Sequence, residues 1–208
     1  MNNNFQIRKV AVLGAGVMGA QIAAHLVNAN VPTILFDLPA QKNDSNRQGD
    51  PDGIVNKALD GLKKLEPSPL ASPAKINFIA AANYDQHLEQ LRDCDLVIEA
   101  IAERMDWKSD LYHKVAPYLG AQTIFASNTS GLSINKLAEA FPENLRHRFC
   151  GGQFLRPIAF TQNIFYRIIG FAIGQTISLR RQIQHMNVLA GFLIHAAFAF
   201  LPQRALFD

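Results

Sequence analysis

Residues 9–30 read KVAVLGAGVMGAQIAAHLVNAN, and this stretch contains the pattern that decides the fold. Its first six residues are an apolar run that ends in glycine, which is typical of a buried parallel strand. The remainder is rich in alanine, with apolar residues at helical spacing. Residues 31–38, VPTILFDL, follow as a second apolar run. Together the strand, helix and strand have the length of one βαβ unit.

Three glycines, Gly14, Gly16 and Gly19, form a GxGxxG motif between the predicted strand and the predicted helix. The first allows a tight turn, the second lets a pyrophosphate approach the backbone, and the third lets helix and strand pack closely. Asp37 ends the second strand, where a carboxylate accepts hydrogen bonds from a ribose 2′-hydroxyl and repels a 2′-phosphate. The motif therefore predicts a dinucleotide site that favours NAD over NADP, although such a turn alone can merely connect two elements.

Strand and helix patterns continue to alternate as far as residue 141. Further strands are expected in 76–80, 95–101 and 123–130, and further helices in 54–65, 87–91, 107–119 and 132–141. In the first of these helices, the apolar side is expected to contain Ile54, Ala58, Leu62 and Leu65. The alternation predicts an α/β fold of the Rossmann type, a doubly wound parallel sheet with helices on both faces.

Polar residues follow two of these strands on the side where such sheets bind ligands. Ser127, Asn128, Thr129 and Ser130 can hydrogen-bond a nicotinamide or a substrate oxygen, or they can cap the next helix. Glu99 and Glu103 frame the end of the preceding strand, where lone carboxylates are expected to be solvated. The residues Lys57, Lys63 and Lys64 form a basic face that could meet phosphate, or that is simply solvated.

Composition excludes several classes of function. The 20 basic and 17 acidic residues give a net charge of +3, with no Lys/Arg cluster that would predict nucleic-acid binding. Cys94 and Cys150 lack metal-binding spacing, so we expect no metal site and reduced thiols in the cytoplasm. No signal peptide is visible at the N-terminus.

The chain changes character after residue 151. From there to the C-terminus it contains five arginines and one aspartate, with neither lysine nor glutamate. We therefore divide it into an NAD-binding domain, residues 1–151, and an atypical apolar tail, residues 152–208, which is expected to be irregular or helical. The second apolar run of the tail has about 14 residues, fewer than the roughly 20 that span a membrane, so a membrane span is disfavoured.

Three segments, 9–26, 95–119 and 123–151, together resemble the NAD-binding domain of the 3-hydroxyacyl-CoA dehydrogenase family. The second reads DLVIEAIAERMDWKSDLYHKVAPYL and the third begins TIFASNTSGLSINKL. The resemblance covers residues 7–151. It implies oxidation of (S)-3-hydroxyacyl-CoA to 3-oxoacyl-CoA in fatty-acid β-oxidation, with hydride transfer to NAD, and it implies a dimer for the intact family.

The resemblance also implies roles for individual residues. The cofactor-side positions are Gly14, Gly16, Gly19, Asp37, Glu103 and Lys108. Ser130 matches the serine that hydrogen-bonds the reacting oxygen of the substrate. The arm around Ile54–Leu65 helps to hold CoA, which favours the three lysines as CoA contacts.

One position departs from the family pattern. Where the family has its general-base histidine this chain has Gln153, and no glutamate follows that could orient a histidine. Glutamine cannot accept and release a proton near neutral pH. Three explanations compete: a change of reading frame near codon 152, an inactive NAD-binding module whose tail packs against the sheet or a partner, and a tail that associates with a membrane.

Overall fold

The computed structural model describes residues 6–41 and 49–152. Six parallel strands form one sheet in the order β3-β2-β1-β4-β5-β6. The strands are β1 (Val10–Leu13), β2 (Thr33–Asp37), β3 (Ile79–Asn83), β4 (Leu96–Glu99), β5 (Ile124–Ser127) and β6 (Phe149–Gly151). The strand order reverses between β1 and β4, and ligands bind at the carboxyl ends of the strands at such a point.

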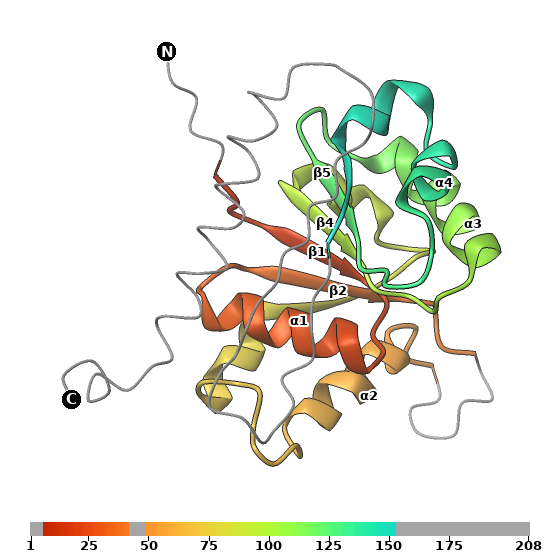
Figure 1. Cartoon of the computed structure of the whole chain (residues 1–208). Helices are drawn as coiled ribbons and strands as arrows, with labels where there is room; N and C mark the ends of the chain where they lie inside the picture. Colours follow the sequence, from red (N-terminus) through yellow and green to blue (C-terminus); the bar gives the residue numbers. More distant parts are fainter. Residues whose placement is uncertain (1–5, 42–48, 153–208) are drawn as a thin grey trace.

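Helices cover both faces of the sheet (Figure 1). The α-helices are α1 (Val17–Asn28), α2 (Gly53–Leu62), α3 (Met105–Val115) and α4 (Ile134–Glu139). Short 3-10 helices are η1 (Pro73–Phe78), η2 (Leu88–Asp93), η3 (Ala116–Tyr118) and η4 (Glu143–Arg148). Helices α1 and α2 lie on one face, and α3 and α4 lie on the other. Within the described residues, no helix has the length and apolar character needed to cross a membrane.

Each face of the sheet has its own hydrophobic core. On one face, residues of α1 and α2 pack against alternate residues of the strands, among them Val10 and Val12. On the other face, Ala11 and Leu13 contribute to a second cluster. That second cluster includes four aromatic rings whose neighbouring centroids lie 4.7 to 5.9 Å apart: Tyr112, Phe125, Phe141 and Phe149. Burial of successive residues on opposite faces accounts for the uniformly apolar strands.

The structure confirms the doubly wound parallel sheet and corrects several details. The expected strand at 76–80 begins only at Ile79, because the preceding residues form η1, and the expected helix at 87–91 is the 3-10 helix η2. The buried side of α2 contains Val55, Leu59 and Leu62. The prediction was right for Leu62, but it placed Ile54 and Ala58 where the next residues along the chain, Val55 and Leu59, are buried. Strand β6 was not expected. The tail lies outside the described residues.

Candidate dinucleotide-binding site

The glycine turn between β1 and α1 is closely packed at two of its three positions. Gly14 has φ +105°, a conformation that residues with a side chain rarely adopt, and a Cβ there would lie 2.9 Å from the carbonyl oxygen of Ala100. A Cβ on Gly19 would lie 1.8 Å from the carbonyl oxygen of Gly14. The first and third glycines therefore have the turn and packing roles that the motif predicts.

The second glycine differs, because it faces open space. Gly16 is exposed, and a Cβ placed on it would meet no atom within 4 Å. It is the N-cap of α1, whose first turn contains no acidic residue. No side chain of this first turn therefore neutralises the positive end of the helix dipole, and an anion can approach the backbone at Gly16. These features fit a pyrophosphate group.

Asp37 lies at the carboxyl end of β2, beside this turn. Its Oδ2 accepts a hydrogen bond from the amide of Ala15 at 2.6 Å, and its Oδ1 accepts one from the amide of Leu38 at 2.7 Å. These two bonds fix the carboxylate while leaving it half-buried, so its remaining lone pairs can accept ribose hydroxyls. The neighbouring Val17 and Leu38 are about 60% exposed.

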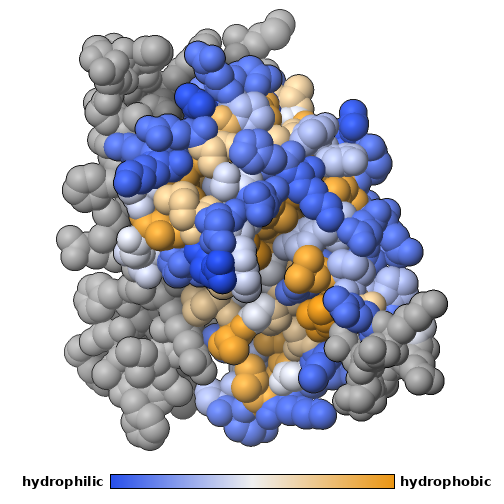
Figure 2. All heavy atoms as spheres, turned by 90° about the vertical axis from the view of Figure 1, so that its right-hand side faces the viewer, coloured by the Kyte–Doolittle hydropathy of each residue, from blue (hydrophilic) through white to orange (hydrophobic). Residues whose placement is uncertain are grey.

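Figure 2 shows the side of the molecule that carries the carboxyl ends of the strands. Polar residues cover most of this side, and apolar residues interrupt them near the middle of the view. A surface of mixed character suits a dinucleotide, whose rings are apolar and whose phosphates and riboses are polar.

A fully buried carboxylate lies at the end of β4. Glu99 Oε1 accepts hydrogen bonds from the amide of Ile101 at 2.8 Å and from Lys108 Nζ at 2.6 Å. Its Oε2 accepts bonds from the Tyr112 hydroxyl at 2.8 Å and the Ser127 hydroxyl at 2.7 Å. Burial, with the nearby Glu99 carboxylate, raises the pKa of Tyr112, so this hydroxyl remains a donor. The network joins β4, α3 and β5.

A second glutamate holds the turn after β5. Glu103 Oε2 accepts a hydrogen bond from the Thr129 hydroxyl at 2.7 Å, and its Oε1 accepts one from the amide of Ser130 at 2.8 Å. Partial burial disfavours the charged form, but these bonds and the positive charge of Lys108 outweigh it and lower the pKa of Glu103. Glu103 is therefore ionised at neutral pH beside the exposed Ser130.

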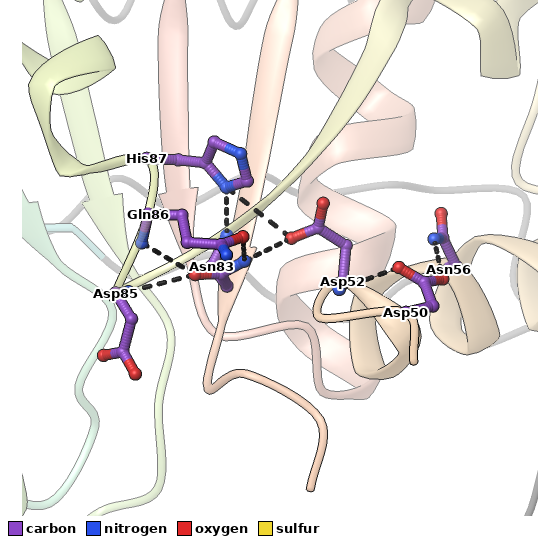
Figure 3. A network of polar contacts seen from close by, with 7 residues as sticks. All are labelled: Asp50, Asp52, Asn56, Asn83, Asp85, Gln86 and His87. Carbon is purple, nitrogen blue, oxygen red and sulfur yellow. Dashed lines mark hydrogen bonds and ion pairs between the residues drawn. The ribbon is translucent and has the colours of Figure 1, made fainter. Parts of the chain in front are cut away.

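A separate polar network fixes the start of α2 to the end of β3 (Figure 3). Asn83 Nδ2 donates to Asp52 Oδ1 at 2.7 Å, and His87 Nδ1 lies 3.6 Å from the same oxygen. Asp50 accepts hydrogen bonds from the Asp52 amide and from Asn56 Nδ2. The arm that carries the predicted CoA contacts is therefore attached to the sheet at the edge where the cofactor residues lie.

The structure brings most of the predicted site residues to this one edge. The glycines, Asp37, Glu103 and Ser130 follow the carboxyl ends of β1, β2, β4 and β5. The three lysines Lys57, Lys63 and Lys64 are exposed on α2 and just beyond it, and Lys63 lies 3.1 Å from Asp60. Lys108 is fully buried against Glu99. The position matching the family's histidine, Gln153, lies outside the described residues.

One expectation about this region was wrong. Glu99 was expected to be solvated, but it is completely buried, and three residues of other elements bond to it. A signal was present, since the polar residue closes an otherwise apolar strand and Lys108 and Tyr112 follow at helical spacing. Of the two readings left open for residues 127–130, capping of the next helix does not apply. The N-cap of α4 is Ser133, whose hydroxyl accepts a hydrogen bond from the Lys136 amide.

Comparison with known proteins decides the family. Residues 9–164 match the family model described as 3-hydroxyacyl-CoA dehydrogenase, NAD binding domain. The chain belongs to the 3-hydroxyacyl-CoA dehydrogenase family. The matched part of that family is the part that binds NAD, in agreement with the glycine turn and Asp37.

Relatives of this dehydrogenase family cover different lengths of the chain. A Rickettsia felis protein described as a fatty acid oxidation complex trifunctional enzyme is 38% identical over 208 aligned residues, covering 94% of this chain and 28% of its own length. A 3-hydroxybutyryl-CoA dehydrogenase of Bradyrhizobium diazoefficiens is 34% identical and covers 73% of this chain and 49% of its own length. The chain thus spans about a quarter to a half of these relatives.

A solved structure shows the same fold. The (S)-3-hydroxybutyryl-CoA dehydrogenase of Ralstonia eutropha has a TM-score of 0.57 and 27% identity, covering 74% of this chain and 51% of that one. The family match and the Rickettsia felis match both continue beyond Gly151. Other curated relatives that match cover 67–74% of this chain.

Proposed function

We propose that this chain binds NAD and a 3-hydroxyacyl-CoA or 3-oxoacyl-CoA ester at the carboxyl edge of its sheet. The observation that carries the proposal is the joint position of the glycine turn and the Glu103–Ser130 hydrogen bond at that edge. The glycine turn provides for a pyrophosphate, and the hydrogen bond from Glu103 fixes the exposed Ser130 at the same edge of the sheet. Family membership supports the reaction type.

The residues present fit a bound NAD, which would supply the hydride acceptor for oxidation of a hydroxyl group. The open backbone at Gly16 would hold the pyrophosphate, and Asp37 would accept the ribose hydroxyls. Ser130 would donate its hydroxyl to the reacting oxygen of the substrate, because Glu103 already fixes its backbone amide. Lys108, predicted on the cofactor side, acts in this proposal through Glu99, because its ammonium group is fully buried there.

We propose further that turnover by this chain is slow. Gln153 stands where the family has its general base, and loss of general acid–base help costs about 10²–10⁴-fold in rate. The same substitution supports a second candidate function, an NAD-binding module without turnover.

Titration of the full chain with NADH and NADPH, followed by fluorescence, tests the proposal. We expect saturable NADH binding, weaker NADPH binding, and a smaller difference between the two in Asp37→Asn. Acetoacetyl-CoA reduction should be slow, and Ser130→Ala should lower its rate without changing NADH affinity. Absence of saturable NADH binding would refute the proposal, and NADH binding with no turnover at any pH would select the second candidate.

The three exposed lysines are proposed to contact the phosphates of CoA. A Lys57→Gln/Lys64→Gln variant should bind acetoacetyl-CoA more weakly and NADH unchanged. Lys136→Gln is a matched control, because this lysine is also exposed but lies on α4 on the opposite face of the sheet. Equal loss of CoA-ester affinity in both variants would indicate a general charge effect.

A further inference from the structure

We propose that Glu99 is a positioning residue that sets the place of the turn carrying Ser130, with Lys108 as its counter-ion. The importance of Ser130 rests on the proposed function. The positioning itself is a property of the chain alone, and it can be measured without any ligand.

The Glu99 carboxylate bonds to both segments that form the substrate side of the site. Through Ile101 it holds the start of the loop that carries Glu103, and through Ser127 it holds the last residue of β5. The backbone carbonyl of Glu99 also accepts the amide of Asn128 at 2.7 Å. Side chain and backbone of one residue therefore fix two successive residues just before Thr129 and Ser130.

The register of the sheet makes this arrangement possible. Glu99 and Ser127 are paired neighbours in β4 and β5, so their side chains leave the sheet on the same side. Glu103 then bonds to Thr129 and Ser130 from the loop that Glu99 holds. Residues 127–130 are therefore bonded at both ends to the segment 99–103. A shift of Ser127 would consequently also move Ser130.

Stability alone does not explain this network. Burial of a carboxylate and an ammonium group costs so much solvation free energy that apolar residues of similar volume are often equally stable or more so. Four donors in fixed directions, however, define one position for the Glu99 carboxylate and for the groups that bond to it. Lys108 neutralises this charge, and its full burial leaves its ammonium group no surface for direct contact with a ligand.

The test compares two hydroxyl deletions, one at the carboxyl end of β5 and one at the residue just before β5 begins. Ser127→Ala removes a buried hydroxyl that bonds to Glu99 at 2.7 Å at the carboxyl end of β5. Thr123→Val removes a buried hydroxyl that bonds to the Cys94 carbonyl at 2.7 Å at the other end. The readouts are the free energy of unfolding, amide hydrogen exchange of residues 128 and 130, and NADH and acetoacetyl-CoA affinity of the full chain.

We expect both variants to lose similar unfolding free energy, but only Ser127→Ala to exchange these amides faster and to bind acetoacetyl-CoA several-fold more weakly. Equal exchange rates in the two variants would overturn the proposal. Faster exchange in Ser127→Ala with unchanged affinity would overturn the link between the position of this turn and substrate binding, provided the wild-type chain binds the ligand. If the wild type binds neither ligand, the proposed function fails while the exchange comparison still decides whether Glu99 positions the turn.

Discussion

Glu99 on β4 and Lys108 on α3 form an ion pair of 2.6 Å in which both side chains are completely excluded from solvent. Burial of either charge without the other would leave its lost solvation uncompensated. The Tyr112 and Ser127 hydroxyls and the Ile101 amide supply the remaining hydrogen bonds of the carboxylate.

This pair predicts a strong dependence of one substitution on the other. Glu99→Gln and Lys108→Met should each lower the free energy of unfolding by about 3–5 kcal/mol, because each leaves an unpaired buried charge. The double variant should lose less than the sum of the two. Urea unfolding of the four proteins measures this coupling, and additive losses would show that the two charges do not depend on each other.

The glycine motif predicts two different outcomes for the same substitution. Gly19→Ala should destabilise the fold by about 1–3 kcal/mol or more, because the added methyl group meets the Gly14 carbonyl. Gly16→Ala should fold normally, because nothing lies near its Cβ, but it should bind NADH more weakly. Thermal unfolding and NADH fluorescence separate the two effects, and a stable Gly19→Ala would contradict the packing described for the turn.

Tyr84 contains a buried hydroxyl whose removal should be tolerated. The ring of Tyr84 stacks on Phe36. Its hydroxyl lies near the Gly14 amide, but that amide donates its hydrogen bond to the Phe36 carbonyl. The hydroxyl therefore makes no hydrogen bond to the described residues. Tyr84→Phe should therefore leave stability unchanged or raise it by about 1 kcal/mol. Tyr112→Phe is the control, since its hydroxyl bonds to Glu99 and its loss should destabilise the protein. A destabilised Tyr84→Phe would show that the hydroxyl has a partner.

The Asp95 carboxylate predicts a contribution to stability that depends on pH. Partial burial opposes its ionisation, but hydrogen bonds from the Arg8 amide and guanidinium and from the Lys9 amide outweigh this and lower its pKa. Because the folded pKa lies below the unfolded value of 3.8, the stabilisation is complete well above pH 3.8 and is lost as the pH falls through the folded pKa.

Asp95→Asn should accordingly be less stable than wild type by about 1 kcal/mol at neutral pH, with a difference that shrinks in acid. Urea unfolding at a series of pH values gives the comparison. Asp93→Asn is a suitable control, because Asp93 is an exposed neighbour. A difference that grows in acid would mean that the sign of the shift is wrong.

The sequence was sufficient to predict five of the six strands, because these are short apolar runs separated by helical patterns and turn residues. It was also sufficient for the glycine turn and Asp37, whose spacing is set by the βαβ unit. It failed for the side of α2 that is buried, because Ile54 and Val55 are both apolar and only the contacts choose between them. It failed for Glu99 because the partners of its side chain come from α3, β5 and the loop after β4. The local pattern indicates that Lys108 and Tyr112 share one face of a helix, but it does not show that this face meets Glu99.

The two hydrophobic clusters lie on opposite faces of the sheet and are separated by its backbone. A substitution in one cluster, such as Val55→Ala, and one in the other, such as Phe141→Ala, should therefore have nearly additive effects on stability. In evolutionary terms the two faces can diverge independently. One face can accept a new packing arrangement without a compensating change on the other, as long as the edge that holds the glycine turn and Ser130 keeps its geometry.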